Sequence, residues 1–113
     1  MSIVLVGLPE LWRRLNLGVH RSLWSRIHCR TSLEQPSPED TAEYINYRLE
    51  RVGSKTSPFA SDAISLLHEA TGGQLRDIDR VATACLRVAS AQKVKRVDRE
   101  ILQDVVDSDT NLP

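Results

Sequence analysis

Arg76 has the surroundings expected of a side chain that binds an anion. It follows Gly72 and Gly73, a pair typical of a helix end and a tight turn, and it falls in the first turn of the next helix. The first turn of a helix exposes N–H groups and a partial positive charge, so a cation there is unfavourable unless an anion lies nearby. Arg76 is therefore a candidate phosphate ligand. The alternative is a solvated arginine paired with Asp77 or Asp79.

Arg26 lies in a basic segment near the N-terminus. A guanidinium stays charged and its planar fork binds phosphoryl oxygens bidentately. One interpretation of the basic segment is a surface that binds phosphate or an acidic partner. The other is a helix face exposed to solvent. A surface arginine stacked on Trp24 is one such solvated arrangement for Arg26. The first third of the chain contains one acidic residue, Glu10, and five arginines: Arg13, Arg14, Arg21, Arg26 and Arg30.

Other chemistries are disfavoured by the residue pattern. Cys29 and Cys85 stand alone, without the close cysteine or histidine spacing of a zinc site, so no metal site is predicted. His28 beside Cys29 lacks a second ligand or carboxylate at helical spacing, which argues against a nucleophile there. No apolar run approaches the roughly 20 residues of a membrane span, and no signal peptide is recognised. These patterns predict a cytoplasmic protein with reduced thiols.

The elements before residue 34 read as a short strand and one or two short helices. Ile3 to Val6 is an apolar, β-branched run closed by Gly7, which predicts a strand buried on both faces of a parallel sheet. Residues 10–15 and 20–27 are expected to be helical, with their tryptophans on apolar faces. A single strand is not a sheet, so its partners must come from other sequence or from another copy.

The rest of the chain predicts a mainly α bundle. Residues 34–36 form a polar linker, and Ser37 then begins a helix as N-cap, with proline at the first position and an acid three residues after the cap. Apolar residues at helical spacing predict four helices over residues 37–107, the central one from Gln74 to Gln92. Residues 108–113 lack this periodicity and are expected to fray.

In this order the motifs resemble the C-terminal portion of an AAA+ ATPase, namely the last core elements followed by the helical lid. Ile3 to Leu11 resembles a late core strand with its exit into a helix, and Leu23 to Ile27 resembles an arginine-finger segment. Glu34 to Leu49 resembles the first lid helix, and Gly73 to Ile78 resembles the sensor 2 motif. The resemblance is greatest to the group that includes the secretion protein ExeA and the transposition ATPases related to TniB and TnsC.

The resemblance implies roles for both arginines. Arg76 would touch the terminal phosphate of ATP in its own subunit, and Arg26 would act catalytically as an arginine finger in the neighbouring one, with Arg30 as a weaker substitute. It also implies a homo-oligomer formed through the arginine-finger face. The phosphate-binding loop, Gly-x-x-x-x-Gly-Lys followed by Ser or Thr, and an acidic strand end for magnesium are absent from these residues. ATP and Mg²⁺ are therefore expected in a longer parent protein, and no cofactor or hydrolysis is expected for this segment alone.

Three functions remain open at this stage. The first is a C-terminal ATPase segment, residues 1–33 being the core remnant and residues 37–107 the lid, that serves DNA transposition together with DNA and a transposase. Its alternative within the same family is a secretion ATPase of the ExeA type. The second is a standalone protein- or DNA-binding helical module that uses the helix after Gly73. The third is self-association through the tryptophans and the strand-like N-terminus.

Overall fold

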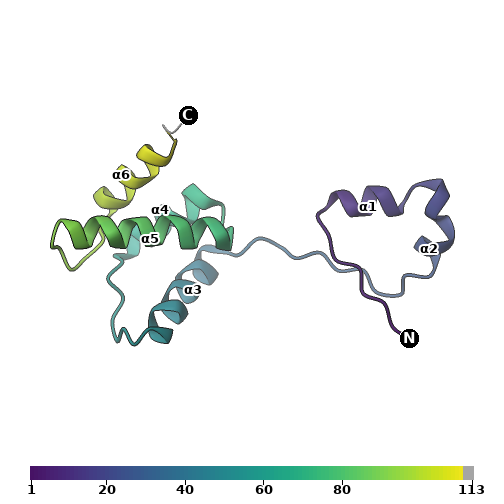
Figure 1. The fold of residues 1–113 in the computed structure, drawn as a ribbon, viewed down its shortest axis with the longest axis horizontal. Coiled ribbons are helices and arrows are strands. Elements are labelled where there is room, and N and C mark those ends of the chain that lie inside the picture. Colours follow the sequence, from purple (N-terminus) through teal and green to yellow (C-terminus); the bar gives the residue numbers. More distant parts are fainter. Residues whose placement is uncertain (111–113) are drawn as a thin grey trace. The chain divides into compact units, whose positions relative to one another are not determined.

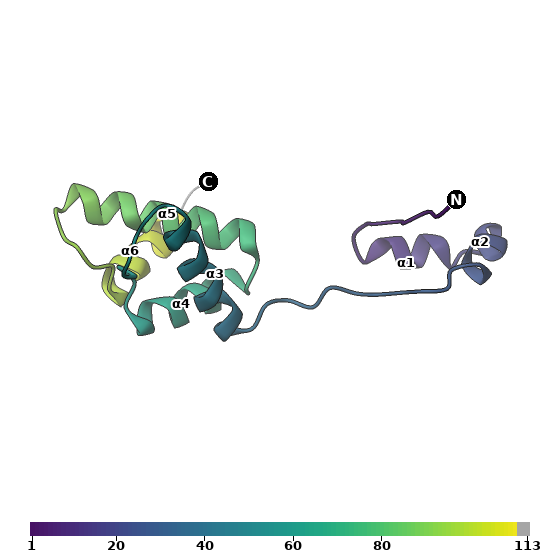
Figure 2. The ribbon, with the colours of Figure 1, turned by 90° about the horizontal axis from the view of Figure 1, so that it is seen from below.

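The computed structural model describes residues 1–110, with the side chain of Thr110 excluded, and divides the chain into two compact units. The N-terminal unit covers Met1–Leu33, and the helical unit begins at Glu34. Figures 1 and 2 show that helices are the regular elements of both units, which confirms the prediction of a mainly α chain for the described residues.

The N-terminal unit contains two short α-helices and one 3₁₀ turn. These are α1 (Glu10–Leu15), η1 (Gly18–His20) and α2 (Arg21–Ser25). The predicted helix over residues 20–27 is thus shorter than expected and begins with the 3₁₀ turn. The ring centroids of Trp12 and Trp24 lie 5.9 Å apart in an edge-to-face arrangement that holds α1 against α2.

The predicted strand at residues 3–6 is wrong for this structure. Residues 3–6 form no strand in the structure. A β-bridge joins Phe59 and Val97, but it is isolated and does not involve residues 3–6. Ile3 and Val4 are 73% and 83% exposed. The physical reason is the absence of a partner within the described residues, because a strand is stabilised by hydrogen bonds to a neighbouring strand and this segment has none here.

The helical unit contains four α-helices, which Figure 1 labels α3 to α6. α3 (Pro38–Arg51) begins with a capping box, in which the Ser37 hydroxyl accepts from the Asp40 backbone and the Asp40 carboxylate accepts from the Ser37 backbone. α4 (Ser61–Thr71) ends at Gly72, which adopts the left-handed conformation. α5 (Leu75–Ala91) and α6 (Arg99–Thr110) follow.

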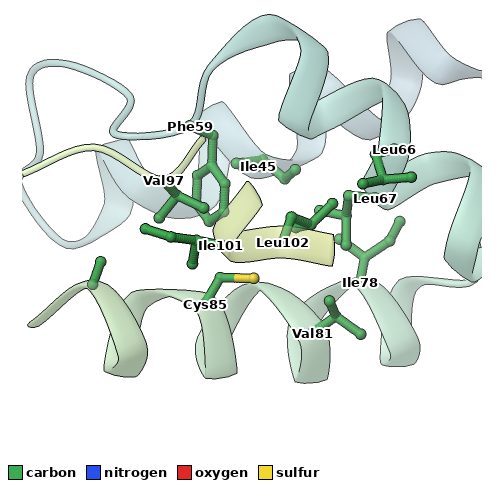
Figure 3. Close-up of a cluster of buried hydrophobic side chains, with 11 residues drawn as sticks. Ile45, Phe59, Leu66, Leu67, Ile78, Val81, Cys85, Val97, Ile101 and Leu102 are labelled. Atoms are coloured by element: carbon green, nitrogen blue, oxygen red, sulfur yellow. The ribbon is translucent and has the colours of Figure 1, made fainter. Parts of the chain in front are cut away.

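A single apolar cluster joins the helices of this unit. α6 packs against both α4 and α5, and α3 packs against α4. The buried side chains meet between these elements, as Figure 3 shows, and Leu67, Val97 and Leu102 are fully buried. The members of the cluster are Ile45, Phe59, Leu66, Leu67, Ile78, Val81, Cys85, Ala89, Val97, Ile101 and Leu102.

The C-terminal end differs from the prediction. Residues 108–110 were expected to fray, but α6 continues through them to Thr110. Asp109 accepts a hydrogen bond from Arg80 of α5, which ties the last turn of α6 to the neighbouring helix. This bond lowers the pKa of Asp109. The remainder of the predicted tail, residues 111–113, lies outside the described residues.

Candidate functional site

The turn between α4 and α5 places Arg76 in the second position of α5. Gly72 and Gly73 have φ angles of +63° and +80°, a conformation that glycine adopts without a Cβ clash. Gln74 is the N-cap residue, and its side chain makes no capping hydrogen bond. Leu75 and Arg76 then follow, both exposed. The local sequence therefore forms the turn and helix start that it predicts.

Arg76 has no ion pair or side-chain hydrogen bond within residues 1–110. The acids that could neutralise it have other partners: Asp77 Oδ1 lies 3.4 Å from Arg80 Nη2, and Asp79 Oδ1 lies 3.9 Å from Arg48 Nε. The pairing considered as the alternative role of Arg76 is thus not formed. An unpaired guanidinium remains at a helix end that itself favours anions.

A hydrogen bond from Tyr44 also occupies the carboxylate of Asp79. Tyr44 Oη donates to Asp79 Oδ2 at 2.9 Å, which links α3 to the first turns of α5. Burial and this hydrogen bond raise the pKa of Tyr44, so the phenol stays protonated and continues to donate. Asp79 is therefore engaged on both carboxylate oxygens. Sequence reasoning did not identify this contact, because it joins residues 35 positions apart.

The turn between α4 and α5 lies close to the end of the linker. Gly73 is buried, and a Cβ added to it would lie 2.8 Å from the Pro36 carbonyl oxygen and 3.1 Å from His68 Cε1. His68 Nδ1 lies 2.8 Å from the hydroxyl of Thr41, which is fully buried. We call these four residues, Pro36, Thr41, His68 and Gly73, the linker joint. Thr41 and His68 are not among the candidate residues that the sequence pattern indicates.

Arg26 is the C-cap residue of α2, and its side chain is exposed. Its predicted alternative, stacking on Trp24, is made instead by Arg30, whose guanidinium carbon lies 4.1 Å from the centre of the indole. Arg30 Nη2 also donates to the Trp24 carbonyl oxygen at 3.0 Å. Within residues 1–110 the Arg26 side chain makes no hydrogen bond or ion pair. Arg26 and Arg76 belong to different units.

Other chemical features of the described residues are few. No group of three or more His, Cys, Asp or Glu side chains is placed to hold a metal ion. Burial raises the pKa of the Cys85 thiol to about 11, so it behaves as a core residue and not as a nucleophile. No helix within residues 1–110 combines the length and the apolar character needed to cross a bilayer.

The helical unit also has a shallow apolar groove between α3 and α5, with a volume of about 220 Å³. Leu49, Val52 and Leu86 supply apolar side chains, and Arg48 with Asp79 forms a polar edge. Val52 is 80% exposed. Residues of the groove come mainly from α3 and α5, which are far apart in the sequence, so a local sequence pattern does not reveal it.

Comparison with known proteins finds one informative relationship. The chain is similar to the General secretion pathway protein A of Aeromonas hydrophila, with 33% identity over 92 residues. The aligned part is 81% of this chain but 17% of that protein, so the chain corresponds to a small part of its relative. No family model matches the chain, and no solved structure matches it significantly.

Proposed function

We propose that this chain is a C-terminal segment of a secretion-type AAA+ ATPase, in which the helical unit is the nucleotide-sensing lid. The observation that carries the proposal is the similarity to a General secretion pathway protein over 81% of the chain. This relative supports the secretion alternative of the sequence analysis. The transposition function, with DNA and a transposase as partners, gains no support from it and is not part of the proposal.

Within this proposal, Arg76 is the residue that senses the terminal phosphate of ATP. Its support is the unpaired, exposed guanidinium in the first turn of α5, next to acids that have other partners. The positive end of a helix and a guanidinium together favour a phosphoryl group. ATP and Mg²⁺ would be bound by other sequence of the longer protein, where the metal ion would neutralise phosphate charge.

Arg26 is proposed to serve a neighbouring subunit as the arginine finger. It is exposed at the end of α2, and Arg30, not Arg26, stacks on Trp24. A guanidinium in that role stabilises the negative charge that develops during phosphoryl transfer. The proposal therefore includes a homo-oligomer in which one copy completes the site of the next.

The test uses the protein encoded by the complete reading frame that contains these residues. The proposal requires a phosphate-binding loop and an acidic strand end in that protein, together with ATP hydrolysis. Arg26→Ala should lower kcat by roughly 10³-fold, whereas Arg21→Ala, a matched exposed arginine of α2, should leave it nearly unchanged.

Arg76→Ala should raise KM for ATP or lower kcat by about tenfold or more, while Arg87→Ala, an exposed arginine of the same helix, should have little effect. A reading frame without a nucleotide-binding loop would refute the proposal. Equal effects of each candidate arginine and its matched control would also refute the assigned roles.

A further inference from the structure

The linker joint connects three helices and the end of the linker at one place. Thr41 lies in the first turn of α3, His68 in the last turn of α4, and Gly73 just before α5. Pro36 immediately precedes the capping box that starts α3, so its carbonyl is fixed relative to that helix. The same carbonyl lies so close to Gly73 that a side chain there would collide with it.

Burial makes these contacts specific. Thr41 is 0% exposed, and its hydroxyl has His68 Nδ1 as its side-chain partner at 2.8 Å. A buried hydroxyl that lost its partner would carry a desolvation cost, so the bond holds α3 and the end of α4 in one geometry. The end of α4 leads directly into the turn, where the Gly72 N–H donates to the His68 carbonyl oxygen at 2.8 Å.

From this geometry we propose that Thr41 and His68, with Gly73, are positioning residues that fasten the first turn of α5, and with it Arg76, to the end of the linker. Pro36 and Arg76 then move as one body. Any rotation of the helical unit relative to preceding sequence takes place on the N-terminal side of Pro36, and it carries Arg76 with it. The functional meaning rests on the proposed role of Arg76 in sensing phosphate.

The first experiment measures amide hydrogen exchange on the 113-residue chain by NMR. Thr41→Val keeps the side-chain shape and removes the hydroxyl. It should speed exchange at the Gly72 and Gln74 amides by about five- to tenfold, because roughly one hydrogen bond of local stability is lost. The Val97 amide, which donates to Pro58 at 2.8 Å, should be unchanged.

Thr41→Ser is the matched control, since it restores the hydroxyl and should return exchange at both turn amides to within about twofold of the original rate. Faster exchange at the turn amides alone, rescued by serine, supports the joint. Equal acceleration at Val97, or no acceleration at the turn, overturns it.

The second experiment measures ATP hydrolysis by the full-length protein in a double-mutant cycle. If Thr41 acts through Arg76, Thr41→Val should lower kcat/KM about fivefold in the native background and less than twofold when Arg76→Ala is already present. Equal losses in both backgrounds overturn the positioning role.

The two proposals fail in distinguishable ways. If Arg76→Ala itself leaves hydrolysis unchanged, the sensing function of Arg76 is refuted and the functional part of this inference falls with it. The exchange measurements on the 113-residue chain still decide separately whether the linker joint fixes the first turn of α5.

Discussion

The two units of this chain differ in how they bury their apolar side chains. The helical unit has a continuous core in which Leu67 and Leu102 are fully buried, whereas Leu15 is the one buried side chain among residues 1–33. The N-terminal unit leaves most of its apolar residues exposed, Val6 and Leu8 at 89% and 78%. Burial of apolar area is the main favourable term in folding. The helical unit therefore has the larger stabilisation from burial, and the N-terminal unit has little.

The units also differ in charge. Residues 1–33 carry five arginines and one glutamate, and the remaining residues carry ten basic and fourteen acidic side chains, giving formal charges of +4 and −4. Both tryptophans lie in the N-terminal unit. Tryptophan emission therefore reports the N-terminal unit and far-UV circular dichroism mainly the helical unit, so the two units are measured separately.

The largest expected effect tests the contrast in burial. Leu67→Ala should lower the free energy of unfolding by about 2–5 kcal/mol, because it leaves a cavity in the core. Leu8→Ala, in the exposed segment, should change it by less than about 0.5 kcal/mol. Urea unfolding followed by circular dichroism measures both. Similar losses from the two substitutions would show that the N-terminal segment is buried in solution.

Two glycines of the helical unit can be compared to test the contact between Gly73 and Pro36 in the linker joint. Gly53 and Gly73 both have positive φ, but space is open around Gly53 and a Cβ at Gly73 would meet Pro36. Gly53→Ala should cost about 1 kcal/mol from backbone strain alone, and Gly73→Ala about 2 kcal/mol or more. Chemical denaturation of the two variants gives the difference. Equal costs would mean that the Pro36 contact is absent in solution.

The capping box at the start of α3 should have a smaller effect. Ser37→Ala should destabilise the helical unit by about 1 kcal/mol, whereas Ser61→Ala, at a helix start without a side-chain cap, should be nearly neutral. Hydrogen bonds from the Ser37 backbone and side chain lower the pKa of Asp40 from 3.8.

The sign of the pH dependence follows from this lowered pKa. The stabilisation from Asp40 is fully present at a pH above the pKa of this carboxyl in the unfolded chain. It is lost as the pH falls through the lower pKa of the folded chain. Thermal unfolding between pH 7 and pH 2 should therefore show an acid-dependent loss in the native chain that is reduced in Asp40→Asn. An identical acid profile in the two proteins would contradict the assignment of that loss to Asp40.

The smallest effect is expected in the N-terminal unit. Arg30→Ala removes the stacking on Trp24 and the bond to its carbonyl, which is worth about 0.5–1 kcal/mol at an exposed site. Trp emission should shift to the red and acrylamide quenching should increase, with no change in circular dichroism from the helical unit. Arg26→Ala should leave the emission unchanged. A shift with Arg26→Ala instead would show that Arg26 is the arginine on the ring in solution.

The sequence by itself determined the local features of the helical unit. The capping motif at Ser37 and the glycines at 72 and 73 fixed helix ends because they act through neighbouring backbone groups, and α3 and α5 lie within a residue or two of the predicted bounds. The position of Arg76 at a helix start follows from the same local rules. Whether it meets a phosphate remains a prediction.

Tertiary structure decided which partners these residues have. Asp79 binds Tyr44 and lies near Arg48, Arg30 rather than Arg26 stacks on Trp24, and Thr41 bonds His68, none of which local periodicity specifies. The apolar run at residues 3–6 has the composition of a strand but forms none here. The physical reason is that helices satisfy their backbone hydrogen bonds within one segment, whereas strands and side-chain pairs require partners brought together by the rest of the fold.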